Sequence, residues 1–203
     1  MRSVACAVLA LLAAGVCYCR ADDVSDIKAS GRAFSEAMRN NDIPAAKKHA
    51  ILSEKQETLL ANWAAFNSSR EKLTKAAVDK FGDEGKDIVA QRQGRQPQLD
   101  FDKSKFDNAD IKVTGDTAVV TSKDPDHREI ARFKNDGGKW KLDFKDNPNM
   151  ERAAQSAPVL EKLAGVYNDV AGEIKDGKYK SVQEARRALG TKMAALFARP
   201  RQG

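Results

Sequence analysis

Two histidines are the residues of this chain best suited to acid–base or metal chemistry. His49 follows Ala45 by four residues, so a helix places it on an apolar stripe, where an acidic partner would make it a general base. A hydrogen-bonded or half-exposed helix histidine is the structural alternative. His127 ends the run Asp124-Pro125-Asp126-His127, but three polar side chains in one turn seldom complete a metal shell. The sequence offers His49 as its candidate base and predicts no metal site.

Motifs that bring a cofactor or a nucleophile are missing from the sequence. It contains no glycine-rich phosphate loop, no Gly-x-Ser-x-Gly elbow and no His-Glu-x-x-His pair. All three cysteines, Cys6, Cys17 and Cys19, lie near the N-terminus. The rest of the chain therefore has no disulfide, no thiolate metal site and no cysteine nucleophile. We expect no cofactor.

The first 21 residues have the pattern of a signal peptide. Arg2 gives a positive start, residues 4–16 are almost wholly apolar, and Ala21 supplies a small residue before a cleavage point. A membrane span needs about 20 apolar residues, more than this stretch offers. A lipid anchor is the competing interpretation, although the residues before Cys17 and Cys19 are not small. We expect an exported chain, secreted or periplasmic, that begins after Ala21.

Basic and acidic residues are mixed along the remaining chain. The 35 basic residues include Arg2 and Arg20, so cleavage leaves 33 against 29 acidic residues, a net charge of +4. A nucleic-acid surface gathers Lys and Arg on one face instead. We predict no nucleic-acid partner and no membrane span after cleavage.

The middle of the chain has the alternation of half-buried strands. Trp140 and Leu142 are separated by one lysine, a period of two that places them on one face of a sheet. Asn135-Asp136-Gly137-Gly138 predicts a hairpin turn. Centring the pairing there sets Phe133 opposite Trp140 and Ala131 opposite Leu142. An antiparallel meander with one apolar face is predicted.

Helical periodicity precedes these strands. The first helix is expected to end at Asn40-Asn41-Asp42, and a long second helix, straight or bent near Ser53, to run from Ala45 to Phe66. Ser68 and Glu71 have the spacing of a capping box, which predicts a third helix from there to Gly82. A polar loop over residues 90–98 and a short strand at Leu99–Phe101 follow.

Two more helices are predicted after the strands. The first carries apolar residues from Val159 to Ile174 and stops at Asp176-Gly177. Ser181 and Glu184 form a second capping box, followed by an apolar stripe that ends at Phe197. These helices are expected to form a hairpin packed on the main body.

The order of these elements resembles the NTF2-like superfamily, also called SnoaL-like or cystatin-like. The resemblance covers Ile27 to Phe144 and rests on the helix break Asn41-Asp42-Ile43-Pro44, on Val113 to Val120 around a Gly115-Asp116 turn, and on Gly137 to Leu142. It implies a curved antiparallel sheet that wraps around the helices and leaves a conical pocket. Enzymes of this superfamily carry an Asp or His base with a Tyr or second acid in the cone, and no residue set here matches that motif. Many of its other members bind ligands without catalysis.

The predicted fold is α+β, with N-terminal helices packed on a curved antiparallel sheet in an NTF2-like cone, plus a C-terminal helical hairpin. The expected organisation is a signal peptide at 1–21, an NTF2-like domain at 22–148 and a C-terminal helical extension at 149–203.

The leading functional hypothesis is an exported, non-catalytic domain that binds a small apolar ligand or a protein partner. The candidate lining of its cone is Trp63, Phe66, Phe133, Trp140 and Leu142, although aromatic residues at such spacings are more often core. One alternative is an NTF2-like lyase or isomerase that uses His49 as base. Another is an assembly protein that forms a homodimer through its C-terminal helices.

Overall fold

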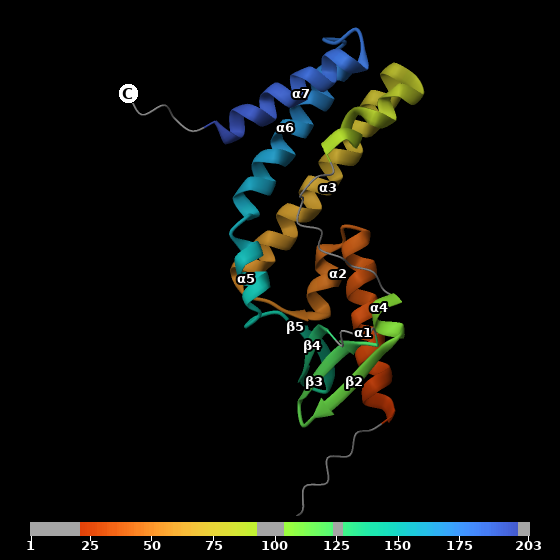
Figure 1. The fold of residues 1–203 in the computed structure, drawn as a ribbon, viewed down its shortest axis with the longest axis vertical. Coiled ribbons are helices and arrows are strands. Elements are labelled where there is room, and N and C mark those ends of the chain that lie inside the picture. The colour runs from red at the N-terminus through yellow and green to blue at the C-terminus, as the bar shows by residue number, and fades with distance from the viewer. Residues whose placement is uncertain (1–20, 93–103, 124–127, 199–203) are drawn as a thin grey trace, which may run out of the picture.

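The computed structural model of this chain describes residues 21–92, 104–123 and 128–198 (Figure 1). The described part is α+β, as predicted, with helices and one five-stranded sheet. Residues 1–20 of the predicted signal peptide, the strand at Leu99–Phe101 and the turn that carries His127 lie outside the described residues.

The first two helices separate where the sequence predicts. Helix α1 (Ala21–Arg39) ends just before Asn41, whose positive φ of 56° turns the chain. Asp42 then caps α2 (Ile43–Lys48), because its Oδ1 accepts a hydrogen bond of 3.0 Å from the backbone nitrogen of Ala45.

Strand β1 (Ala50–Ile51) interrupts the long second helix that the sequence predicts, so that prediction is wrong. The strand pairs in parallel with β5 (Lys139–Asp143), which draws the chain out of the helix. Helix α3 (Glu54–Phe81) begins directly afterwards under a capping box. The Ser53 hydroxyl accepts from the backbone nitrogen of Gln56, and the Gln56 side chain accepts from the backbone nitrogen of Ser53.

Helix α3 continues through the capping box predicted at Ser68, so no third helix begins there. The Ser69 hydroxyl donates to the backbone oxygen of Ala65 at 2.8 Å, the bond that a serine makes inside a helix. Leu73 and Ala77, further along, are fully buried. Burial of this half of α3 stabilises a continuous helix more than a local cap stabilises a break.

The predicted antiparallel meander consists of β2 (Ala109–Thr114), β3 (Thr117–Ser122), β4 (Glu129–Asp136) and β5. Together with β1 they form one sheet, in the order β1-β5-β4-β3-β2. The turn predicted at Gly115-Asp116 is confirmed by the pairing of β2 with β3 across it. The parallel strand β1 makes the sheet mixed rather than wholly antiparallel as predicted.

The hairpin of β4 and β5 has a different register from the predicted one. Phe133 pairs with Leu142 and Asn135 with Trp140, around a tight turn at Gly137-Gly138 in which both glycines have positive φ. The partner of Phe133 is two residues further along than predicted. Because the shift is even, Phe133, Trp140 and Leu142 still share the buried face.

Helix α1 covers the apolar face of the sheet (Figure 1). Its predicted stripe is confirmed, since Ile27, Phe34 and Met38 are buried. The indole nitrogen of Trp140 donates a hydrogen bond of 3.0 Å to Oδ1 of Asp23, which ties the first turn of α1 to β5.

A second group of helices extends away from the sheet (Figure 1). It contains α3, the 3₁₀ helix η1 (Gly82–Arg92), α5 (Pro148–Ala154), α6 (Ala157–Lys175) and α7 (Val182–Phe197). Helix α6 packs along α3, and α7 packs on α6 and η1. The two predicted C-terminal helices are confirmed, whereas a domain boundary at residue 148 stays a prediction. Within the described ranges, no helix combines the length and the apolar character needed to cross a membrane.

Candidate functional site

A cavity of about 120 Å³ lies between η1, α6 and α7. The residues that line it are Ile88, Val89, Tyr167, Arg186, Leu189, Gly190 and Met193. Among the described residues of this lining, Arg186 is the one charged side chain, and the others are apolar, aromatic or glycine. Polar and apolar atoms contribute about equally to the exposed surface of the cavity. Sites for small molecules combine apolar side chains with a few polar groups in this way. The cavity is therefore the candidate functional site.

Helix α7 supplies one wall through a stripe of residues at helical spacing. Arg186, Leu189, Gly190 and Met193 occupy positions i, i+3, i+4 and i+7, so they share one face. The start of α7 sets the direction of that face, and it is fixed by the predicted cap, since the Ser181 hydroxyl accepts from the backbone nitrogen of residue 184. The stripe was visible in the sequence, but the wall opposite it was not.

The opposite wall is η1, which folds back against the end of α3. Gly82 ends α3 with a φ of +67°, a conformation that other residues rarely adopt. A side chain at Gly85 would collide with the backbone of Ala77, because a Cβ there lies 2.3 Å from its carbonyl carbon. These two glycines bring Ile88 and Val89 to the cavity. The sequence of η1 has no periodic pattern that would predict this wall, so the sequence analysis did not predict it.

Tyr167 of α6 forms the third wall and joins the cavity to the main core. It is 3% exposed, and its ring stacks on that of Phe66 in α3 at 5.3 Å between centroids. Helix α6 is therefore held against α3 by an aromatic pair directly behind the cavity.

Arg186, which lines the cavity, also carries a buried donor without a partner among the described residues. One terminal nitrogen, Nη2, donates to the backbone oxygen of Asp87 at 2.9 Å. Its Nε is buried and has no hydrogen-bond partner within the described part of the chain. A buried donor without an acceptor costs about 1–3 kcal/mol.

A polar network at the α6–α7 connection holds α7 in place. Glu173 accepts hydrogen bonds of 2.5 Å from both Lys178 and Tyr179, and it lies 3.3 Å from Nζ of Lys192 in α7. The bonds from Lys178 and then Tyr179 lower the pKa of Glu173 to about 2. Burial, followed by the bond to Glu173, raises the pKa of Tyr179 to about 12. The network fixes the position of α7 relative to α6, and hence two of the cavity walls.

His49 lies at the C-terminal end of α2, away from this cavity. Its Nδ1 is 3.4 Å from the Ser30 hydroxyl, and burial, followed by the charge of Lys48, lowers its pKa. The ring is therefore mostly neutral at neutral pH. Its polar contacts within the described ranges include no carboxylate. The contacts of His49 among the described residues thus lack the acidic partner that a general base requires. A catalytic role for His49 stays a prediction.

The five residues predicted to line a cone lie in two separate places, two in α3 and three on the buried face of the sheet. Phe66 and Trp63 pack together in α3, with ring centroids 6.4 Å apart, and Phe66 also contacts α6. Phe133 packs edge-on against Phe106 of the short helix α4 (Ser104–Asp107), 6.0 Å away. The remaining two share the sheet face with Phe133. None of the five lines the cavity described above, and their role in ligand binding stays a prediction.

The described residues offer no group of three or more His, Cys, Asp or Glu side chains placed to hold a metal ion. His127, with Asp124 and Asp126, lies outside those residues. Comparisons with protein-family models, with curated proteins and with solved structures gave no match.

Proposed function

We propose that this chain is an exported, non-catalytic binding protein that holds a small, largely apolar ligand between η1, α6 and α7. The observation that carries the proposal is the cavity of about 120 Å³, whose described lining combines apolar side chains with the guanidinium of Arg186. A cavity of about 150 Å³ admits benzene, so the apolar body of the ligand has a comparable size. The described residues of the lining include no carboxylate, histidine, serine or cysteine, which favours binding over catalysis.

Export is supported by the signal-peptide pattern of the first 21 residues. Removal of that segment is compatible with the contacts that α1 makes with the sheet. Cleavage after Ala21 would keep nearly all of α1, including Asp23 and its hydrogen bond to Trp140. Mass spectrometry of the chain recovered outside the cytoplasm should give the mass of a protein that begins at Asp22. Recovery of the uncleaved chain would contradict export by signal-peptide cleavage.

An NTF2-like arrangement is the proposed family relation for Ile27 to Phe144. It is supported by the break between α1 and α2, by the antiparallel order of β2 to β5, and by the position of α1 on the apolar face. In this proposal the sheet curves around α1 and the cone is filled by core side chains. A crystal structure with a flat sheet would contradict it.

Ligand binding can be tested by NMR titration of the mature chain with benzyl alcohol. We expect shifts of backbone amide signals concentrated in η1, α6 and α7. Gly190→Leu adds a side chain at a lining position and should abolish these shifts. Gly165→Leu is the matched control, because a side chain at this exposed helix position meets nothing within 4 Å. Equal shifts in both variants, or shifts scattered over the whole chain, would contradict the proposal.

The assembly hypothesis has one observation in its favour. Phe197 at the end of α7 is 61% exposed, although its helical spacing predicts a buried position. Large exposed apolar residues can mark protein contacts, but a single one is also common on monomers. Light scattering of Phe197→Ser tests it: a halved mass supports a dimer through α7, and an unchanged mass argues against it.

A further inference from the structure

Strand β2 is the outermost strand of the sheet on the side opposite β1 (Figure 1). Its six residues pair with β3 along one edge, and no strand of the described chain pairs with the other edge. Unpaired backbone N–H and C=O groups along an edge can bond to another strand. The outer edge of β2 is therefore a place where a further chain can extend the sheet.

The turn after β2 determines which of its backbone groups point outward. Thr114 ends β2 directly before a two-residue turn, so its backbone bonds to β3. Bonded and non-bonded pairs alternate along an antiparallel ladder, so Asp110 also bonds to β3. This agrees with the hydrogen bond of 3.4 Å that the Thr121 hydroxyl donates to the backbone oxygen of Asp110. The residues whose backbone groups point to the outer edge are Ala109, Ile111 and Val113.

The apolar face of the sheet is incompletely covered at this edge. Ile111 pairs with Val120 of β3, and Val113 pairs with Ala118. Both β3 residues are buried, whereas their β2 partners on the same face are only half-buried. A strand added beyond β2 would remove more of these apolar side chains from water, which stabilises the association.

Two charged residues on the other face of β2 indicate which strand fits the edge. Asp110 and Lys112 are both exposed. Asp110 lies 3.8 Å from Nζ of Lys123, whereas Lys112 has no ion pair within the described ranges. Charges on an edge strand usually hinder pairing with foreign strands. When two β2 strands pair in antiparallel fashion about Ile111, however, each Asp110 is directly opposite Lys112 of the other copy. Opposite charges at such positions stabilise a strand pair, and like charges destabilise it.

We propose that two copies of this chain pair through their β2 strands, antiparallel about a two-fold axis at Ile111, and form one continuous sheet. The axis makes Ile111 a hydrogen-bonded pair with itself, as the outward direction of its backbone groups requires. Ala109 then pairs with Val113 of the other copy, so the apolar faces of the two sheets join on the same side. Because a two-fold contact is self-complementary, both charge pairs form at once.

The short length of β2 predicts a weak dimer. Stable interfaces bury about 1,600 Å² in total, more than the pairing of two six-residue strands covers. We expect a dissociation constant on the order of 10–100 μM. The dimer should therefore form and dissociate with changes in protein concentration.

Sedimentation equilibrium of the mature chain, at concentrations on either side of this value, measures the dimer. Asp110→Lys and Lys112→Asp each create two pairs of like charges across the axis and should weaken dimerisation at least about tenfold. An equimolar mixture of these two variants restores opposite charges at every position and should dimerise as wild type does. Lys134→Glu is the matched control, because it reverses an exposed charge on the same sheet face in β4, away from the edge. It should leave the dissociation constant unchanged.

Three results would overturn the proposal. The first is a wild-type chain that stays monomeric at every concentration, which leaves the edge to a strand of another protein. The second is a dimer that Asp110→Lys and Lys112→Asp form as well as wild type does, or that their mixture fails to restore. The third is a dimer that Phe197→Ser dissociates, since its contact lies in α7 instead.

Discussion

The guanidinium of Arg186 in α7 donates a hydrogen bond of 2.9 Å to the backbone oxygen of Asp87 in η1. This bond joins two walls of the cavity that are 99 residues apart in sequence. It also fixes the guanidinium before any ligand arrives, which reduces the conformational entropy that binding must overcome. The same side chain thus lines the cavity and joins two of its walls.

Replacement of Arg186 by methionine should leave the protein almost as stable as before. We expect the free energy of unfolding to change by less than about 1 kcal/mol, because loss of the bond to Asp87 is offset by removal of a buried, unpartnered donor. Urea denaturation measures the change, with Arg187→Met as control. A loss of about 3 kcal/mol or more would indicate that Arg186 has a mainly structural role.

Replacement of Gln56 by alanine should be strongly destabilising. The Gln56 side chain links Ser53 to Phe144 through hydrogen bonds to both. Its Nε2 donates to the backbone oxygen of Phe144 at 2.7 Å, so the start of α3 is tied to the end of β5. The side chain is fully buried, and its loss leaves the backbone N–H of Ser53 without this acceptor. The Phe144 oxygen loses one of two donors, because it also accepts from the backbone nitrogen of Asn147. We expect a cost of about 2–4 kcal/mol in urea denaturation.

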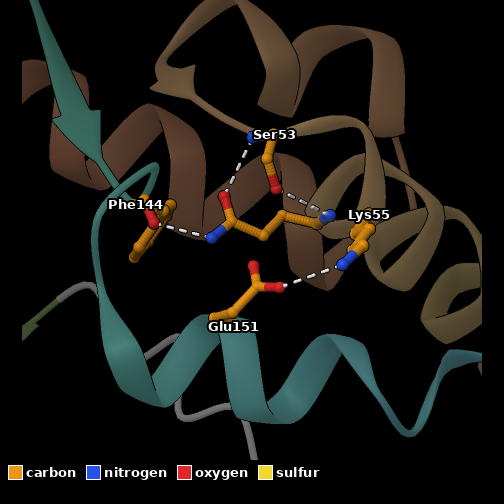
Figure 2. Close-up of polar contacts among 5 residues, drawn as sticks. Ser53, Lys55, Phe144 and Glu151 are labelled. Carbon is orange, nitrogen blue, oxygen red and sulfur yellow. Dashed lines mark hydrogen bonds and ion pairs between the residues drawn. The ribbon is translucent and has the colours of Figure 1, made fainter.

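The neighbouring ion pair gives the control for Gln56. Nζ of Lys55 lies 3.5 Å from Glu151 in α5 (Figure 2), and the Lys55 side chain is 78% exposed. Exposed pairs contribute little, so Lys55→Ala should cost less than about 1 kcal/mol. Equal effects of the two substitutions would contradict the assignment of Gln56 as the principal polar link at this junction.

The pH dependence of stability should include a contribution from Glu173. Its pKa falls from an ordinary value of 4.5 to about 2 in the folded chain, mainly through the bonds from Lys178 and Tyr179. The unfolded chain therefore takes up the proton first, and this stabilisation, present above pH 4.5, is lost as the pH falls toward about 2. Glu173→Gln should be less stable than wild type at pH 7 and should lack this part of the acid dependence.

Glu161→Gln, an exposed substitution on the same helix, is the control for Glu173. Thermal unfolding across this pH range distinguishes the variants. If Glu173→Gln keeps the full acid dependence of the wild type, the network at the α6–α7 connection does not contribute as described.

Two serines test where α3 begins. Ser53→Ala removes the observed cap and should cost about 1 kcal/mol. Ser68→Ala replaces a residue inside the helix and should stabilise it by a few tenths of a kcal/mol up to about 0.5, because alanine has the higher helix propensity. Urea denaturation of both variants gives the comparison. A cost at Ser68 as large as that at Ser53 would place a helix start at Ser68 instead.

Patterns among neighbouring residues predicted the chain reversals and the buried strand faces, because local interactions determine these features. The chain reversals at Asn41, Gly82 and Gly177 occur where predicted, each with a positive φ. The β4–β5 hairpin kept its buried face even though its register was wrong, because side chains alternate with a period of two. Strand β1 has two residues, too few for any periodic signal. The continuity of α3 past Ser68 depends on packing against α6, which its own sequence does not encode.

The cavity was not predicted because its walls meet only in the folded chain. The signal visible in the sequence was Arg186, which lies at helical spacing from Leu189 and Met193 on the otherwise apolar stripe of α7. The stripe alone does not reveal that Ile88 and Val89 face it, since η1 reaches that position through a close approach at Gly85. The aromatic residues that were predicted to line a cone, such as Phe66 and Phe133, instead belong to the core, where aromatic side chains contribute large buried areas.

The measurement that tests the central claim most directly is a crystal structure of the mature chain under xenon pressure. Xenon enters apolar cavities and is located by its scattering. The account predicts an ordered xenon atom in contact with Ile88, Tyr167, Leu189 and Met193. A closed cavity at that position, with xenon bound elsewhere or nowhere, would contradict it.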